Sequence, residues 1–164
     1  MGAKSRRGGA AFERRVACIL REWLGDDWKV VRNGNHRQGG GAAAAGEFTI
    51  SHALDGAILP LAVECKSRRA PPINYARLFE DFGELAPWWE QATEQAGELH
   101  MPLLVFWSPR KPVICAARAL DVPQSALRGS IDLEAVGVCS LASWVHSAPA
   151  RLLLWGPYDN RRPS

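Results

Sequence analysis

Apolar residues recur at three- and four-residue intervals near the start of the chain, and this spacing predicts a helix over residues 9 to 24. Gly25 ends the pattern, as a glycine commonly ends a helix. Glu13 lies at the edge of the apolar face rather than opposite it. We interpret Glu13 either as a carboxylate that pairs with an arginine or as one directed inward toward a site. The apolar face consists of Phe12, Val16, Ile19, Leu20 and Trp23.

A β-hairpin is predicted between the apolar segments that cover residues 47 to 54 and 57 to 66. The Asp55-Gly56 pair that separates them is a strong signal for a two-residue turn. In the register that such a turn sets, Glu47 on the first strand lies directly opposite Glu64 on the second. The hairpin therefore predicts a close pair of carboxylates far from the turn.

Glu64 and Lys66 carry the candidate chemistry of the second strand. Residues two apart in a strand point to the same face, so both side chains project together while the cysteine between them packs behind. A carboxylate that holds a divalent cation beside an ammonium that holds a developing anion suits metal-assisted phosphodiester hydrolysis; the alternative is a strand end that reaches solvent. Glu47 would lie about 5 Å from Glu64, and two carboxylates that close repel unless a cation or proton separates them. Asp55 is the rival second acid if Pro60, which cannot donate to a strand ladder, disturbs the hairpin.

The rest of the pattern predicts further elements of one domain over residues 1–164. Within it we expect a flexible basic segment over 1–8, a mobile loop rich in Gly, Asn and Ala over 33–46, and a C-terminal extension over 118–164. Gln91 lies one helical turn from Trp88 and is either a surface amide or a polar residue that leans inward. The further helices are predicted over 74–86, 87–99 and 141–146, and the further strands over 28–32, 102–107, 113–117, 131–138 and 152–155.

Composition and charge narrow the class of protein. With 47% hydrophobic and 23% charged residues the chain is globular, and no apolar run approaches the ~20 residues of a membrane span, so we expect no membrane partner. The net charge is only +3, but basic residues concentrate in the first 70 positions, which indicates either a polyanion-binding face or ordinary solvated surface charge. The cysteines lack metal-type spacing and suit buried free thiols in a reducing cytoplasm. They are Cys18, Cys65, Cys115 and Cys139.

The order of these features resembles the PD-(D/E)xK nuclease superfamily and, within it, the archaeal and phage Holliday junction resolvases. A helix with an inward glutamate precedes a strand, a loop, a strand with a carboxylate, a strand with Glu-x-Lys and a further helix. The resemblance covers about residues 5 to 117 and implies an α/β, restriction-endonuclease-like three-layer core, in which helices flank a central mixed sheet. The matching stretches are residues 6–14, 46–50, 63–66, 88–92 and 102–112.

The resemblance also implies a metal site and a role for each of its residues. Glu47, Glu64 and the backbone carbonyl of Cys65 would hold Mg²⁺, with Mn²⁺ as the alternative ion. Glu13 would hold a second metal or a metal-bound water, and Lys66 would orient the attacking water or stabilise the anion. The family usually has aspartate where this chain has Glu47, which leaves that assignment open. The catalytic set is Glu13, Glu47, Glu64, Lys66 and Gln91.

A four-way DNA junction is the substrate that the resemblance implies, cut during recombination or repair to leave 5′-phosphate and 3′-hydroxyl ends. A junction offers two equivalent strands, so a homodimer is expected. The resemblance implies no small-molecule cofactor, and a bacterial, archaeal or phage-infected cell as the location. The alternatives are a restriction or repair nuclease on duplex DNA and a non-catalytic DNA-binding module with the same fold. Basic side chains would grip the DNA backbone rather than read bases. They are Arg6, Arg7, Arg14, Arg32, His36, Arg37, Arg68 and Arg69.

Overall fold

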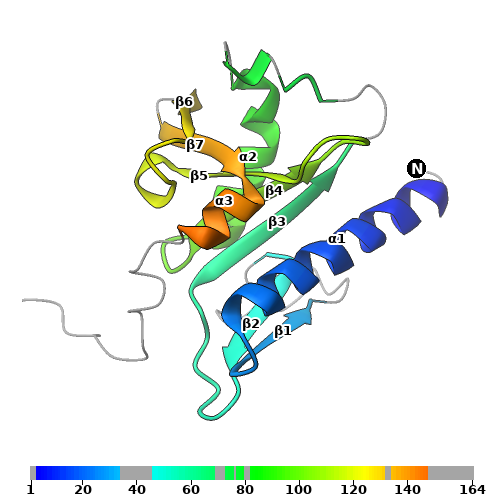
Figure 1. Ribbon diagram of the computed structural model, residues 1–164, viewed down its shortest axis with the longest axis vertical. Coiled ribbons are helices and arrows are strands. Elements are labelled where there is room, and N and C mark those ends of the chain that lie inside the picture. Colours follow the sequence, from blue (N-terminus) through cyan, green and yellow to red (C-terminus); the bar gives the residue numbers. More distant parts are fainter. Residues whose placement is uncertain are drawn as a thin grey trace, which may run out of the picture.

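The computed structural model describes residues 3–33, 46–68, 73–75, 77–79, 82–131 and 134–147. These residues form helices and strands, with three short 3₁₀ turns between them (Figure 1). The helices are α1 (Ala3–Leu24), α2 (Ala86–Ala96) and α3 (Leu141–His146). The strands are β1 (Trp28–Arg32), β2 (Phe48–His52), β3 (Leu61–Ser67), β4 (Met101–Trp107), β5 (Ile114–Arg118), β6 (Leu127–Ile131) and β7 (Glu134–Ser140). The 3₁₀ turns are η1 (Arg77–Phe79), η2 (Gly83–Leu85) and η3 (Ala119–Asp121).

A mixed five-stranded sheet forms the centre of the fold, with the strand order β3-β4-β5-β7-β6. β3 and β4 are parallel, as expected of two strands joined by a helical crossover, here through α2. The other neighbours in this sheet run antiparallel. β1 and β2 form a separate antiparallel pair, which lies below α1 in Figure 1. The predicted α/β class with a mixed sheet and helices is therefore confirmed.

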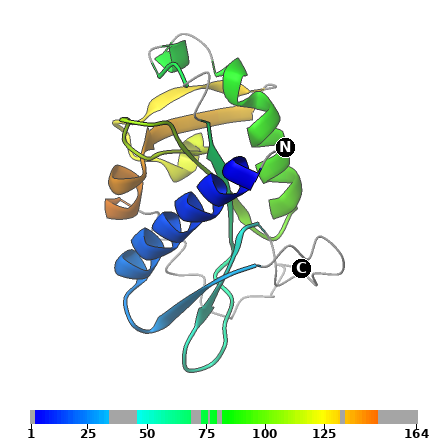
Figure 2. The same ribbon diagram turned by 90° about the vertical axis from the view of Figure 1, so that its right-hand side faces the viewer.

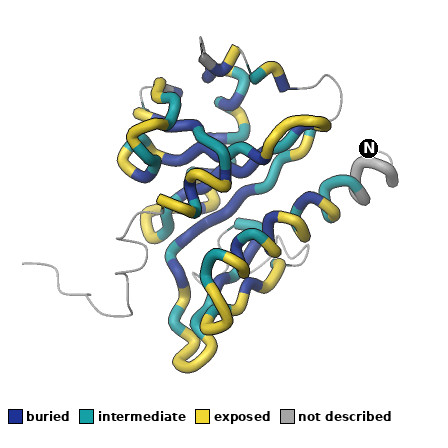
Figure 3. Tube along the Cα trace, in the orientation of Figure 1, coloured by how far each residue is buried: buried dark blue, intermediate teal, exposed yellow. Residues whose placement is uncertain are grey.

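Two hydrophobic clusters pack against opposite faces of this sheet. Since side chains alternate along a strand, β4 gives Leu103 and Val105 to one cluster and Leu104 and Phe106 to the other. The first cluster includes residues of α1, β1, β2 and α3, and the second includes residues of α2. Figure 2 shows α2 and α3 on opposite sides of the strands. Most of β3 and β4 is buried between these layers of side chains (Figure 3), so a charged residue on β3 is held in a fixed environment.

The predicted bounds agree best with the structure for helices and strands that depend mainly on their own local sequence. β1 and α3 have the predicted bounds. α1 begins at Ala3 rather than at residue 9, so residues 3–8, predicted to be flexible, continue the helix, to which Ala3 and the arginines are well suited. α2 ends at Ala96 instead of residue 99 because Gly97, with φ of +55°, breaks the helical backbone.

Two of the predicted elements differ more strongly from the structure. The segment predicted as a helix over 74–86 contains the short turns η1 and η2 among its described residues, although Leu78, Phe82 and Leu85 are buried. Gly83 lowers helix propensity there, and packing against the sheet holds the apolar residues without a helix. The strand predicted over 131–138 covers the end of β6 and most of β7, two strands that pair antiparallel within the five-stranded sheet. The predicted strand over 152–155 and residues 34–45 of the predicted loop lie outside the described residues.

β2 and β3 do not form the predicted two-residue hairpin. β2 pairs along its length with β1, and it meets β3 only through isolated bridges at Ser51 with Ile58 and at Gly46 with Val63. Four residues separate His52 from Ala57, whose carbonyl accepts the His52 N–H at 2.8 Å. β3 diverges after this wider turn because its backbone pairs with β4 over seven residues, a long-range contact that outweighs the local turn.

Candidate functional site

Glu64 and Lys66 lie together on β3 and point away from the face on which Val63 and Cys65 pack. The carboxylate of Glu64 is only 3% exposed, and its Oε1 lies 2.5 Å from Lys66 Nζ. Lys66 also donates to Gln91 Oε1 on α2 at 2.6 Å. The structure thus brings together three of the residues singled out in the sequence. A buried carboxylate requires such a partner because burial of an unpaired charge is costly.

Glu47 reaches the same region by a different route from the one predicted. Its backbone N–H donates to the Val63 carbonyl at 2.7 Å, so it lies beside β3 one residue from Glu64. Gly46 makes this approach feasible: its φ is +75°, and a Cβ there would lie 2.6 Å from the Val63 carbonyl oxygen. Asp55 instead closes the turn, where it accepts from the Ala57 N–H at 3.0 Å. The structure therefore places Glu47, and not Asp55, next to Glu64.

Asn33 and Thr49 hold Glu47 in this position, and no pattern in the sequence singled them out. The Asn33 N–H donates to the Glu47 carbonyl at 2.8 Å, and its side chain donates to the Gly46 carbonyl at 3.0 Å. Thr49 Oγ1 in turn donates to Asn33 Oδ1 at 2.7 Å. These bonds fix the backbone on both sides of the carboxylate.

The electrostatics of Glu47 show that three carboxylates share this region. Burial is the main cause that raises the pKa of Glu47, and the charges of Glu13 and Glu64 raise it further. Arg32 and Lys66 partly offset that effect. Glu13, on α1, forms an ion pair with Arg32 Nε at the end of β1. The region therefore concentrates negative charge that the protein's own cations compensate only in part.

Arg68 and Glu84 anchor the segment before α2 to the end of β3. Arg68 Nη1 lies 2.5 Å from Glu84 Oε1, and its guanidinium carbon lies 5.1 Å from the centre of the Trp88 ring. The side chain of Arg68, predicted to contact DNA, is thus engaged within the protein. Trp88 supports this anchor and packs against the second hydrophobic cluster, so it is not a free stacking surface.

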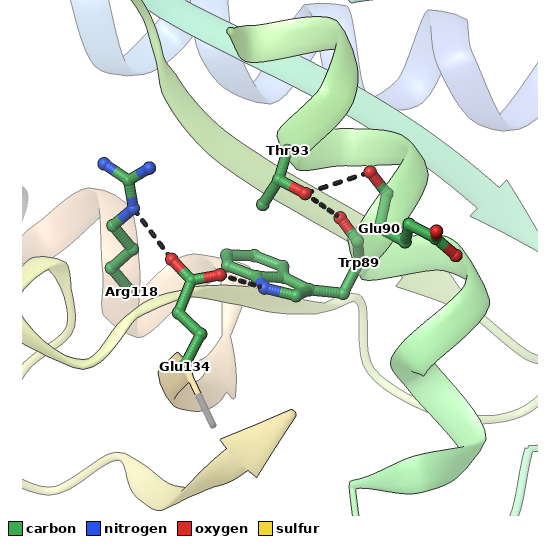
Figure 4. A network of polar contacts seen from close by, with 5 residues as sticks. All are labelled: Trp89, Glu90, Thr93, Arg118 and Glu134. Atoms are coloured by element: carbon green, nitrogen blue, oxygen red, sulfur yellow. Dashed lines mark hydrogen bonds and ion pairs between the residues drawn. The ribbon is translucent and has the colours of Figure 1, made fainter. Parts of the chain in front are cut away.

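A second group of polar contacts holds α2 against the sheet (Figure 4). Trp89 Nε1 donates to Glu134 Oε2 at 2.7 Å, and Arg118 Nε donates to Glu134 Oε1 at 3.0 Å. Glu134 thereby joins the helix to β5 and β7. Thr93 Oγ1 donates to the carbonyls of Trp89 and Glu90 within the same helix. Since α2 also carries Gln91, this network helps to fix the amide that meets Lys66.

The remaining predicted DNA contacts are only partly within the described part of the chain. Arg14 has an exposed side chain on α1. His36, Arg37 and Arg69 lie outside the described residues, as do the side chains of Arg6 and Arg7.

The donor atoms in this region fit a hard divalent cation in kind. Glu64 Oε2 is buried and has no hydrogen-bond partner, and carboxylate oxygens are what Mg²⁺ prefers. Burial and the neighbouring carboxylates raise the pKa of the Cys65 thiol well above its usual range, and this side chain packs against the first hydrophobic cluster. No three His, Cys, Asp or Glu side chains form a ready-made metal cage within the described ranges. The carboxylates of Glu47 and Glu64 are the groups that would hold a cation.

Comparison with known proteins places the chain in a class of enzymes. Residues 4–132 match the family described as "Phage putative PDDEXK endonuclease", a match that spans most of the chain and includes every carboxylate of the site. The chain belongs to this family, and its resemblance to the PD-(D/E)xK nuclease superfamily is confirmed. Family membership implies a nuclease with a DNA substrate. No curated protein and no solved structure gives a significant match. In the described part of the chain, no helix is both long and apolar enough to span a membrane.

Proposed function

We propose that this protein is a divalent-metal-dependent DNA endonuclease that hydrolyses phosphodiester bonds in four-way junctions. The observation that carries the proposal is the ion pair of the buried Glu64 with the partly exposed Lys66; both residues, and Glu13, act electrostatically on Glu47. A buried carboxylate with one unpaired oxygen lowers the stability of the fold, and groups of this kind are often found at functional sites.

Each side chain of the site has a distinct task in this proposal. Glu47 and Glu64, with the Cys65 carbonyl, would hold Mg²⁺ or Mn²⁺, which supplies an acidified water and offsets charge that builds on the phosphoryl group. Lys66 donates hydrogen bonds toward the attacked phosphate and stabilises the developing anion. Gln91 accepts from Lys66 at 2.6 Å and so orients its ammonium group. Cleavage would leave 5′-phosphate and 3′-hydroxyl ends.

The choice of a four-way junction rests on the resemblance to Holliday junction resolvases and on the basic first part of the chain. Arginines at and near α1 favour contact with the DNA backbone, a mode that selects shape rather than sequence. A homodimer would present two such sites to the two equivalent strands of a junction. The same resemblance supports a restriction-endonuclease-like three-layer core.

Duplex DNA is the alternative substrate, since restriction and repair enzymes use the same residues. A non-catalytic DNA-binding module on this fold is a weaker alternative, because such a module has no need for a buried Glu64 beside Lys66.

The test is a synthetic four-way junction and a duplex of matched sequence, each incubated with the protein and Mg²⁺. Glu64→Gln should cut far more slowly than the wild type, and the matched control Glu94→Gln, which changes an exposed glutamate of α2, should cut like the wild type. We expect cleavage of the junction in preference to the duplex. Equal cleavage of both would favour the restriction or repair enzyme, and binding of DNA without cleavage would favour the binding module.

A further inference from the structure

Contact with DNA alone does not explain the position of Arg32 in the structure. It is the last residue of β1, and its backbone pairs with Phe48, the residue that follows Glu47. Its Nε forms an ion pair with Glu13 Oε2, and its charge also acts on Glu47. One guanidinium therefore offsets the negative charge of two of the three carboxylates in the site.

The ion pair lies at the edge of the core and not in open solvent. The side chain of Glu13 is 13% exposed, whereas that of Arg32 is 43% exposed, so the carboxylate is the buried partner. Lys66 occupies the other end of the site, between Glu64 and Gln91. Arg32 thus pairs with Glu13, and Lys66 pairs with Glu64 at a separate position in the site.

A guanidinium remains charged at any pH at which the protein is folded. The guanidinium of Arg32 therefore keeps its positive charge beside Glu13. A divalent cation at Glu13 would have to displace the guanidinium or lie beside it against strong repulsion. Glu13 is therefore the carboxylate least available to a metal.

We propose that Arg32 occupies the place of a second cation, so that this nuclease binds a single divalent metal, at Glu47 and Glu64. Glu13 is then a positioning residue that holds Arg32 rather than a metal ligand. The inference rests on the proposed function because it assumes a metal at Glu47 and Glu64. It differs from the expectation that Glu13 holds a second metal or a metal-bound water.

Removal of the charge at Arg32 should open the second place. In Arg32→Met, Glu13 loses its cation, so we expect two Mn²⁺ ions per chain in place of one. Arg32→Gln lacks the charge but keeps hydrogen-bonding groups, and it should behave in the same way if Arg32→Met folds poorly. Arg32→Lys keeps a cation and should retain one metal. The double variant Glu13→Gln with Arg32→Met should also return to one.

Arg21→Met is the matched control. Arg21 also spans from α1 to β1, but its guanidinium donates to the Val30 carbonyl at 2.8 Å and contacts no carboxylate of the site. Loss of this arginine should leave one metal bound per chain.

The experiment is a calorimetric titration of each metal-free protein with MnCl₂, without DNA, after circular dichroism has established that the variant is folded. One ion on the wild type and two on Arg32→Met or Arg32→Gln support the inference. Two ions on the wild type would overturn it, as would one ion of unchanged affinity on both charge-removing variants. If the wild type binds no Mn²⁺, the proposed function fails together with the inference, which distinguishes this result from failure of the Arg32 inference alone.

Discussion

Gly46 provides the sharpest test of how the fold positions Glu47. Its φ of +75° costs an alanine about 1–2 kcal/mol. The added Cβ would also lie 2.6 Å from the Val63 carbonyl oxygen and 2.8 Å from the Val63 nitrogen. Both are backbone atoms, so no side-chain rotation relieves the contact.

Relief of this contact requires β2 and β3 to separate by roughly 1 Å, since heavy atoms in such contacts lie about 3.5 Å apart. The Glu47 N–H bond to Val63, now 2.7 Å, would then exceed ordinary hydrogen-bond length, at a further cost of about 1 kcal/mol. We expect Gly46→Ala to lower the free energy of unfolding by roughly 2–3 kcal/mol. It should also weaken Mg²⁺ binding because Glu47 moves away from Glu64.

Gly25→Ala is the matched control for the backbone effect alone. Gly25 has a φ of +78°, but its added Cβ would meet nothing within 4 Å. Urea unfolding of both variants in EDTA separates the two effects, and Gly46→Ala should be less stable by about 1 kcal/mol. If the two variants lose the same stability and Gly46→Ala binds Mg²⁺ like the wild type, the close approach of the strands does not position Glu47.

Four further substitutions test the charges of the site and the neighbouring thiols. Lys66→Met leaves the buried Glu64 without its cation and should lower the free energy of unfolding by roughly 3 kcal/mol, while Gln91→Ala should cost about 1 kcal/mol, both measured in urea. The raised pKa of Glu47 means that the folded state holds this proton more tightly than the unfolded state does. The stability that the proton contributes is present in acid and is lost as pH rises through the pKa of the folded state. Metal-free Glu47→Gln should therefore be more stable than the wild type at pH 7, with the difference vanishing near pH 4. The hydrogen bond from Cys115 lowers the pKa of Cys139, so alkylation of Cys139 by iodoacetamide should rise at lower pH than in Cys115→Ala; identical pH profiles, measured by mass spectrometry, would contradict this.

Local sequence was sufficient to predict the helices and strands whose conformation depends on a few neighbouring residues. The spacing of Val16, Leu20 and their neighbours identified the buried face of α1, and alternation along β3 put Glu64 and Lys66 on one face. Both predictions depend on the repeat of one element and need no knowledge of what packs against it.

The path by which Glu47 reaches Glu64 could not be predicted in this way. The Asp55-Gly56 turn suggested the right neighbours from the wrong register, because pairing of β3 with β4 determines the course of the strand. The tight approach at Gly46 and the support from Asn33 arise between segments distant in sequence. Such contacts appear only once the chain is folded.

Charge pairing was the least predictable part of the site. Arg32 and Arg68 are both predicted to contact DNA, and in the structure each also forms an ion pair with a glutamate. Composition indicates that a segment is basic, but the partner of each arginine depends on tertiary packing.

Loss of the Glu64 carboxylate tests the central claim most directly. Glu64→Gln preserves the shape of the side chain and removes its charge, so circular dichroism should show the fold intact. The decisive measurement is the single-turnover rate of four-way junction cleavage in Mg²⁺ by this variant and by the wild type. We expect the wild type to cut the junction, EDTA to stop the cleavage, and Glu64→Gln to be slower by at least about 100-fold. Cleavage by Glu64→Gln at the wild-type rate, or by the wild type in EDTA, would show that Glu64 does not act in metal-dependent cleavage.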